Sequence, residues 1–172
     1  MTGLSEKYAK SIEELESRII QLLIKALSEK GEVAFTVKDE MLKKIEEIVY
    51  QSYTPLQYER RGSAGGLADP DNISIYVKQD GNEVKMIIRN LTEGNKDVDY
   101  STGTVAPNHL AGIIEYGRTS GLYARNRYGT QDQYMKPRPF TQKTAEALRR
   151  EKKHIDALIK ELNRLGVKAK RL

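Results

Sequence analysis

The stretch from His109 to Phe140 constrains the fold of this chain more than any other part of the sequence. It begins with an apolar run, Leu110 to Ile114, and continues into the turn Glu115-Tyr116-Gly117. A polar segment rich in Arg, Tyr and Gly follows, and the stretch ends on Met135-Lys136-Pro137-Arg138-Pro139-Phe140. Proline fixes φ and glycine permits a left-handed backbone, so we expect two ordered elements joined in a defined direction. The apolar run itself fits either a third strand or a short helix.

Two helices are expected before this stretch. The first, over residues 5–30, is predicted by an apolar stripe at spacings of three and four: Ile12, Leu15, Ile19, Leu22, Leu23, Ala26 and Leu27. Glu32 to Phe35 reads as an extended piece. Thr36 to Asp39 resembles a capping box and predicts a second helix over residues 37–53, which Pro55 ends.

A hairpin and a last helix complete the expected elements. Ile73 to Val77 and Val84 to Leu91 read as strands joined by the tight turn Asp80-Gly81-Asn82. Alternating apolar residues predict that one face of the first strand is buried. The last helix is expected from Thr141 to about Leu165 and is stopped by the glycine that follows.

These elements predict an α+β fold in one domain, residues 1–172. A small antiparallel sheet is expected to pack against two N-terminal helices and a long C-terminal helix. Residues 56–72 and 117–135 lack any period and are predicted to be protruding interaction loops. Residues 166–172 form a basic tail. No apolar run approaches the roughly 20 residues that a membrane span needs, so no membrane contact is expected.

The charge is divided unevenly along the chain. Residues 1–115 carry 14 basic and 19 acidic side chains, whereas residues 116–172 carry 15 basic and 5 acidic ones. A basic half is typical of a surface that faces nucleic acid or an acidic protein. The sequence does not separate these two readings, although docking on an acidic neighbour is favoured.

Catalytic groups are scarce in this sequence. The chain has no cysteine and only two histidines. His109 could pair with Glu115 or Asp99 as an acid–base set, but a residue at a strand entrance is the preferred reading. His154 is expected to be a solvated residue of the last helix. The acidic cluster Asp69 to Asn72 fits turn chemistry better than a calcium loop. We therefore expect no nuclease activity with a divalent metal, and no bound metal or cofactor.

Aromatic composition points to an interaction surface. The chain has ten tyrosines and no tryptophan, and half of the tyrosines lie in or near the stretch described first. Tyrosine interleaved with arginine can stack nucleic-acid bases. It is also typical of protein–protein interfaces, which is the preferred reading.

The order of these motifs resembles the tail-completion, or head–tail joining, family of long-tailed bacteriophages. Members typically show an apolar stretch, Glu-aromatic-Gly, a gap, and a Met-x-x-x-Pro-Phe element that enters the C-terminal helix. Here these are Leu110 to Gly117 and Met135 to Phe140. Tyr50 to Asp69 is similar to a loop of members from Gram-positive hosts. The chain departs from the family in its long gap and at Arg118, where a Thr is common.

The resemblance implies a structural subunit of a phage, or of a phage tail-like particle, at the neck or tail terminus, with no enzymatic activity. Such a subunit would form a homo-oligomeric ring, expected to be a hexamer, that joins the tail tube to the head connector. Implied partners are head connector or stopper proteins and tail tube or tail terminator proteins, with DNA in the lumen as a further partner. The chain would be part of the virion and assembled in the host bacterial cytoplasm. The alternative is a basic nucleic-acid-binding protein or small nuclease.

Two sets of site residues follow from these patterns. Glu115 is expected to hold the loop through an ion pair with Arg118 or Arg138, or to pair with an arginine of a neighbouring subunit. The residues expected at subunit contacts are Tyr58, Arg60, Arg61, Glu115, Tyr116, Gly117, Arg118, Tyr123, Arg125, Arg127, Tyr128, Tyr134, Met135, Pro139 and Phe140. The residues expected to dock on a partner structure are Lys168, Lys170 and Arg171.

Overall fold

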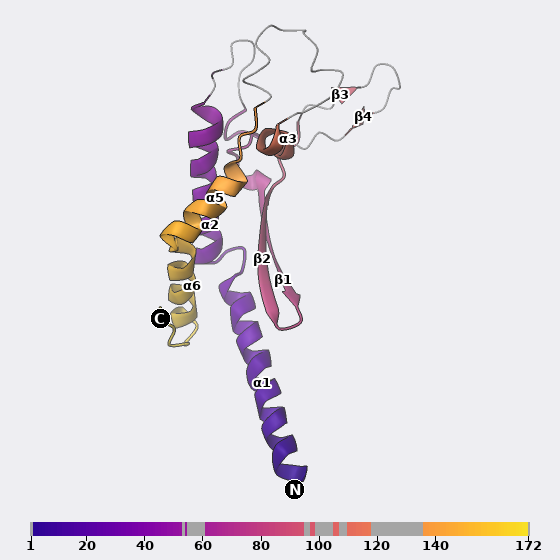
Figure 1. Ribbon diagram of the computed structural model, residues 1–172, viewed down its shortest axis with the longest axis vertical. Coiled ribbons are helices and arrows are strands. Elements are labelled where there is room, and N and C mark those ends of the chain that lie inside the picture. The colour runs from indigo at the N-terminus through magenta and orange to yellow at the C-terminus, as the bar shows by residue number, and fades with distance from the viewer. Residues whose placement is uncertain are drawn as a thin grey trace. The chain divides into compact units, whose positions relative to one another are not determined.

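Figure 1 traces the computed structural model of the chain, which describes residues 2–52, 54, 61–94, 97–98, 105–106, 110–117 and 136–171. Side chains are described from residue 10 onward in these ranges, except at 97–98 and 105–106. The described residues form helices, one hairpin and a second, very short ladder. This confirms the predicted α+β fold.

The two N-terminal helices follow each other closely. Helix α1 spans Thr2–Ala26 and α2 spans Glu32–Lys44. A π-helical segment, Ile45–Tyr50, continues α2. Gly31 lies in the turn between them, where an added Cβ would approach the carbonyl oxygen of Ala26 to 3.0 Å.

Helix α2 begins earlier than the sequence predicts. The extended conformation expected for Glu32 to Phe35 is wrong, because these residues are helical. Thr36, read as a cap, donates from Oγ1 to the Glu32 carbonyl oxygen at 2.8 Å. A threonine hydroxyl can be satisfied one turn back inside a helix, so the capping pattern does not mark a helix start here.

The hairpin has the predicted turn. Strand β1 spans Ile73–Asp80 and β2 spans Glu83–Asn90. Gly81 has φ +59, the left-handed backbone that a tight two-residue turn requires. Ile73 and Ile75 are buried, which confirms the buried face of the first strand. The short strands β3, Asp97–Val98, and β4, Val105–Ala106, form the second antiparallel ladder.

From Leu110 onward, the regular elements of the described residues are helices. Leu110–Tyr116 forms the short helix α3, so the apolar run is not a strand. The expected long C-terminal helix is interrupted and forms α5, Phe140–Glu151, and α6, Lys153–Arg164. Lys152 between them has φ 56, a left-handed conformation that breaks the helical path. Gly166, with φ 86, follows α6 as predicted.

The chain divides into two compact units. Unit 1 comprises Met1–Val37, Ile75–Ile88 and Lys152–Leu172, and unit 2 comprises Lys38–Ser74 and Arg89–Glu151. Most of the larger buried side chains lie in unit 2, and they include Met41, Ile45, Leu67 and Phe140. No helix in the described ranges is long and apolar enough to cross a membrane.

Candidate functional site

The carboxylate of Glu115 caps the N-terminus of α5. Its Oε2 accepts a hydrogen bond from the Thr141 backbone N–H at 2.8 Å, and Oε1 accepts one from Gln142 at 3.0 Å. Glu115 lies at the end of α3 and is buried, with 8% of its surface exposed. A helix N-terminus leaves backbone N–H groups without partners and carries a partial positive charge, so an anion stabilises it. One side chain thereby fastens α3 to α5.

The backbone closes the same junction. The Arg138 N–H donates to the Ile114 carbonyl oxygen at 2.8 Å, although 24 residues separate the two in sequence. Phe140 is buried at 1% exposure, and Thr144 Oγ1 donates to its carbonyl oxygen at 2.7 Å. These contacts join the chain just before the Arg- and Tyr-rich segment to the chain just after it. We call the set Ile114, Glu115, Arg138, Phe140, Thr141 and Gln142 the α3–α5 junction.

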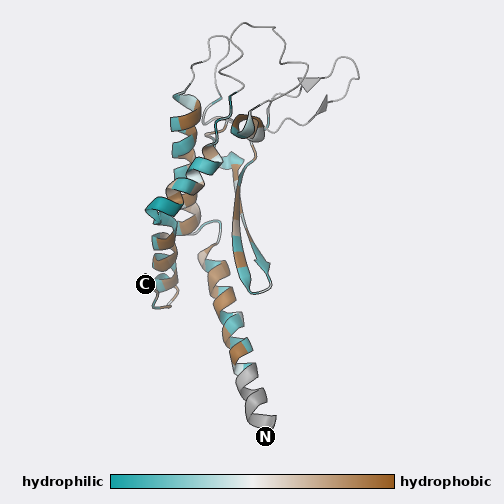
Figure 2. Cartoon of the chain, in the orientation of Figure 1, coloured by the Kyte–Doolittle hydropathy of each residue, from teal (hydrophilic) through white to brown (hydrophobic). Residues whose placement is uncertain are grey.

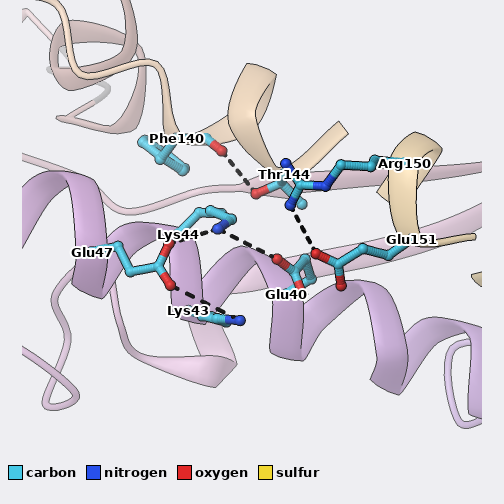
Figure 3. A network of polar contacts seen from close by, with 8 residues as sticks. All are labelled: Glu40, Lys43, Lys44, Glu47, Phe140, Thr144, Arg150 and Glu151. Atoms are coloured by element: carbon cyan, nitrogen blue, oxygen red, sulfur yellow. Dashed lines mark hydrogen bonds and ion pairs between the residues drawn. The ribbon is translucent and has the colours of Figure 1, made fainter. Parts of the chain in front are cut away.

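Helix α5 also packs on the π-helical segment, and a polar network lies beside this contact (Figure 3). Lys44 Nζ donates to Glu47 Oε2 at 2.6 Å and lies 3.7 Å from the buried Glu40 Oε1. The hydrogen bond with Glu47 raises the pKa of Lys44, and the same bond lowers the pKa of Glu47. Both groups therefore stay charged through neutral pH, and their ion pair links the end of α2 to the π-helical segment.

A second tightly held element is the glycine loop, residues 61–69. The Gly66 carbonyl oxygen accepts from the Asp69 N–H at 3.1 Å and from Asn72 Nδ2 at 2.9 Å. The hydroxyl of Thr92, which is 1% exposed, lies 3.2 Å from the same oxygen. A Cβ on Gly66 would lie 2.4 Å from the Gly62 carbonyl oxygen, so only glycine fits there. Leu67 is buried, so this part of the loop belongs to the core.

Side chains from other elements fix the remainder of the glycine loop. The Tyr50 hydroxyl lies 3.4 Å from the Gly62 carbonyl oxygen and accepts from the Ala68 N–H at 3.2 Å. Arg61 Nη2 donates to the Glu93 carbonyl oxygen at 2.6 Å. These bonds hold both ends of the loop, and the Arg61 guanidinium is bound within its own chain.

Asp69 orders the turn that leaves the glycine loop. Its carboxylate accepts from the Asp71 N–H at 2.9 Å and from the Gly65 N–H at 2.6 Å. These two backbone bonds hold the pKa of Asp69 below its usual value. The turn chemistry predicted for Asp69 to Asn72 is confirmed, since Pro70–Asn72 forms a 3₁₀ turn with Asp69 as its cap.

The basic tail folds back along α6 in unit 1. Asn163 and Ala169 exchange two hydrogen bonds, from Nδ2 to the carbonyl oxygen at 3.1 Å and from N–H to Oδ1 at 3.0 Å. Arg171 Nη2 lies 3.1 Å from Asp156 and donates to the Lys152 carbonyl oxygen at 3.1 Å. The tail is thus anchored at the start of α6, and its lysines are exposed beside that anchor.

The structure places the predicted site residues in three groups. Glu115 and Phe140 are buried in their own chain and make intramolecular contacts, as Arg61 does. Tyr116 is 77% exposed beside the left-handed Gly117, and Pro139 is half-buried at the start of α5. The remaining predicted contact residues lie outside the described ranges: Tyr58, Arg60, Arg118, Tyr123, Arg125, Arg127, Tyr128, Tyr134 and Met135.

Two expectations about acid–base groups can be compared with the structure. Both carboxylate oxygens of Glu115 accept backbone hydrogen bonds, so this residue caps a helix. His109 and Asp99, which the sequence suggests as its acid–base partners, lie outside the described ranges. His154 is half-buried rather than solvated, and its Nδ1 has no hydrogen-bond partner within the described part of the chain. The solvated position expected for His154 is wrong.

Sequence reasoning missed the residues that hold the glycine loop. Asn90 ends the second strand and Thr92 lies two residues later, and Asn90 Nδ2 donates to the Leu67 carbonyl oxygen at 2.8 Å. Tyr50 reaches the loop from the end of the π-helical segment. A polar pair at the end of an apolar strand is a weak signal, and no local pattern connects it with a loop far earlier in the chain.

Comparison with known proteins gives a family. No curated protein and no solved structure matches the chain. The YomN family model matches residues 11–164, which include the α3–α5 junction and the glycine loop. That family is derived from the Bacillus phage SPBc2, which gives the coarse functional class of a phage protein. The chain therefore belongs to the YomN family.

Proposed function

We propose that this chain is a structural subunit of a phage neck or tail terminus. It assembles into a ring, expected to be a hexamer, that joins the tail tube to the head connector. Its neighbours are connector or stopper proteins on one side and tail tube or tail terminator proteins on the other, with DNA in the lumen. It resides in the virion after assembly in the host bacterial cytoplasm. The proposal assigns no catalytic role to the chain.

The α3–α5 junction is the observation that carries this proposal. It joins the residues that flank a segment with the composition of a protein interface, through the buried Glu115 and Arg138. The exposed ring of Tyr116 lies at one end of that segment. Interfaces gain affinity when the contacting loops are held in place before binding, because less conformational entropy is then lost. The phage origin of the family supports the same role.

The basic tail supports docking on a neighbouring structure. Lys168 and Lys170 are exposed, while Arg171 is anchored to Asp156 of its own chain. The anchor presents the two lysines from a fixed position, and unlike charges on successive structures steer their assembly. Arg171 belongs to the anchor, so a test of docking leaves it unchanged.

The test reverses the two free tail charges in the phage. Lys168→Glu with Lys170→Glu is expected to reduce the yield of complete particles at least about tenfold, because a charged contact becomes repulsive. Lys30→Glu with Lys78→Glu changes the same number of exposed lysines elsewhere in unit 1 and serves as the matched control. Circular dichroism checks that both variants fold.

Each result has a definite meaning. Loss of particles with the tail variant alone supports docking through the tail. Normal particle yield with the tail variant contradicts docking. If the tail variant assembles normally but loses a salt-dependent DNA binding that the unchanged chain shows, the nucleic-acid alternative is favoured.

A further inference from the structure

The two units bury their apolar side chains to very different degrees. Unit 2 encloses large residues, with Ile45 and Phe140 at 0% and 1% exposure. The buried apolar residues described in unit 1 are mostly small: Ala26, Val33, Ala34, Val37, Ile75 and Ala157. Its large apolar side chains include several that are exposed: Ile12, Leu15, Ile19, Phe35 and Tyr76. Unit 1 therefore leaves exposed much of the apolar surface that would normally form a core.

Three of these exposed residues form one stripe on α1. Ile12, Leu15 and Ile19 are 57%, 58% and 48% exposed and follow the three-and-four spacing of one helix face. We call them the α1 stripe. Figure 2 shows the hydrophobic positions recurring along α1 beyond its first turns. All ten residues from 10 to 19 are exposed.

The α1 stripe continues a contact that the chain already makes. The same face runs on through the half-buried Leu22 to Ala26, which is 0% exposed. Helix α1 packs against α6 within unit 1. Helix stability in proteins comes mainly from packing of the apolar face, so the exposed half of α1 lacks the support that its last turns have.

We propose that the α1 stripe docks on the α6 side of a second copy of this chain. The residues around the stripe are acidic on balance, with Glu13, Glu14 and Glu16 against Lys10 and Arg18. Residues 152–171, which form α6 and the tail, carry seven basic and two acidic side chains. An apolar stripe with acidic flanks fits an amphipathic helix with basic flanks.

The contact joins unlike faces of two copies, so it is head-to-tail. Such contacts generate a closed ring when the rotation between copies closes. The inference therefore rests on the proposed ring and names one of its subunit surfaces. The contact between copies does not require that the chain is located in a phage neck, so the inference and the proposed function can fail separately.

The first test places the same charge on opposite faces of α1. Leu15→Glu puts a carboxylate on the α1 stripe, and Ser17→Glu puts one on the opposite side of the same turn. Both residues are exposed, so neither change removes a core contact. Light scattering on the purified full chain, over a range of concentrations, gives the mass. Leu15→Glu is expected to weaken self-association at least about tenfold, whereas Ser17→Glu matches the unchanged chain.

The second test does not depend on introducing a charge. The chain has no cysteine, so Leu15→Cys and Ser17→Cys each carry a single thiol. In the self-associated protein, maleimide is expected to modify Leu15→Cys at least about tenfold more slowly than Ser17→Cys, because an interface excludes the reagent. Dilution to the monomer should abolish this difference.

Two results would overturn the inference. One is a chain that stays monomeric at every concentration, with equal labelling at both positions. The other is a ring that forms equally well with Leu15→Glu; this would refute the α1 stripe as the contact while leaving the proposed neck function intact. Particles that lack the chain altogether would refute the function without affecting the self-association.

Discussion

Glu115 is the residue on which the account depends most at the smallest scale. A single carboxylate satisfies two backbone N–H groups at the start of α5 and is removed from solvent while doing so. Buried backbone donors without partners are costly, and hydrogen bonds to a charged group are stronger than neutral ones. The Glu-aromatic-Gly motif is therefore explained by helix capping, with the left-handed Gly117 ending α3 directly after it.

Replacing Glu115 should destabilise the fold through this cap. Glu115→Ala is expected to lower the free energy of unfolding by about 2 kcal/mol, and Glu115→Gln by about 1 kcal/mol because one acceptor remains. Glu46→Gln, an exposed glutamate of the π-helical segment, should change it by about 0.5 kcal/mol or less. Urea unfolding measures all three. Equal losses of unfolding free energy for Glu115→Gln and Glu46→Gln would contradict the capping role of Glu115.

Glu161 predicts a loss of stability in acid. Its hydrogen bonds with Arg164 lower the pKa of this carboxyl below the usual value, and its side chain is buried in unit 1. A carboxyl with a lowered folded pKa contributes stability above its unfolded pKa of about 4.3. That contribution is lost as the pH falls through the folded pKa.

The Glu161 contribution is measurable by substitution. The unfolding free energy should be flat near neutral pH and fall below about pH 4.3. Glu161→Gln should make the chain less stable at pH 7 and make the decline in acid shallower. Glu29→Gln, an exposed glutamate of the same unit, should leave the decline unchanged. Parallel curves for Glu161→Gln and the unchanged chain would refute the assignment.

At the scale of elements, the glycine loop is the part whose order the sequence did not reveal. Its composition, rich in glycine and without a period, is typical of an exposed loop, yet Leu67 is buried and Thr92, Asn90 and Tyr50 bind its backbone. The loop is better described as a core element with fixed ends than as a flexible connection.

Two glycines should respond oppositely to the same substitution. Gly66→Ala would place a Cβ 2.4 Å from a backbone oxygen and is expected to cost about 2 kcal/mol or more. Gly112→Ala meets no atom within 4 Å and lies in α3, where alanine is expected to stabilise by about 0.5–1 kcal/mol. Thermal unfolding distinguishes the two signs. A stabilising Gly66→Ala would show that the loop is not packed as described.

Local patterns predicted the elements whose causes are local. The hairpin turn at Gly81 and the turn after Asp69 were predicted because a few adjacent residues determine them. The interruption at Lys152 was not, because lysine rarely takes a left-handed backbone and its carbonyl is bound by Arg171 from the end of the chain. The Thr36 signal was misread since the hydroxyl bonds equally well inside a helix.

The candidate site was predictable in position and less so in chemistry. The Glu115 and Phe140 motifs marked the right segment, but their side chains hold the chain's own helices. The sequence shows which residues are polar or aromatic. It does not show that Glu115 faces a helix N-terminus from 26 residues away.

At the scale of the whole molecule, unit 2 holds the α3–α5 junction and unit 1 carries uncovered apolar surface with a basic tail. A chain with a buried helix junction in one unit and exposed large apolar side chains in the other has the properties expected of a subunit in an assembly. The YomN family membership and the phage origin of that family agree with this view.

Electron cryo-microscopy of purified phage particles that contain this chain tests the proposed function most directly. The account predicts a closed ring of copies between the head connector and the tail tube, with residues 118–135 and Tyr116 at contacts between copies or with the adjoining ring. The absence of the chain from purified particles, or its presence only as isolated copies away from the neck and tail terminus, would contradict the account.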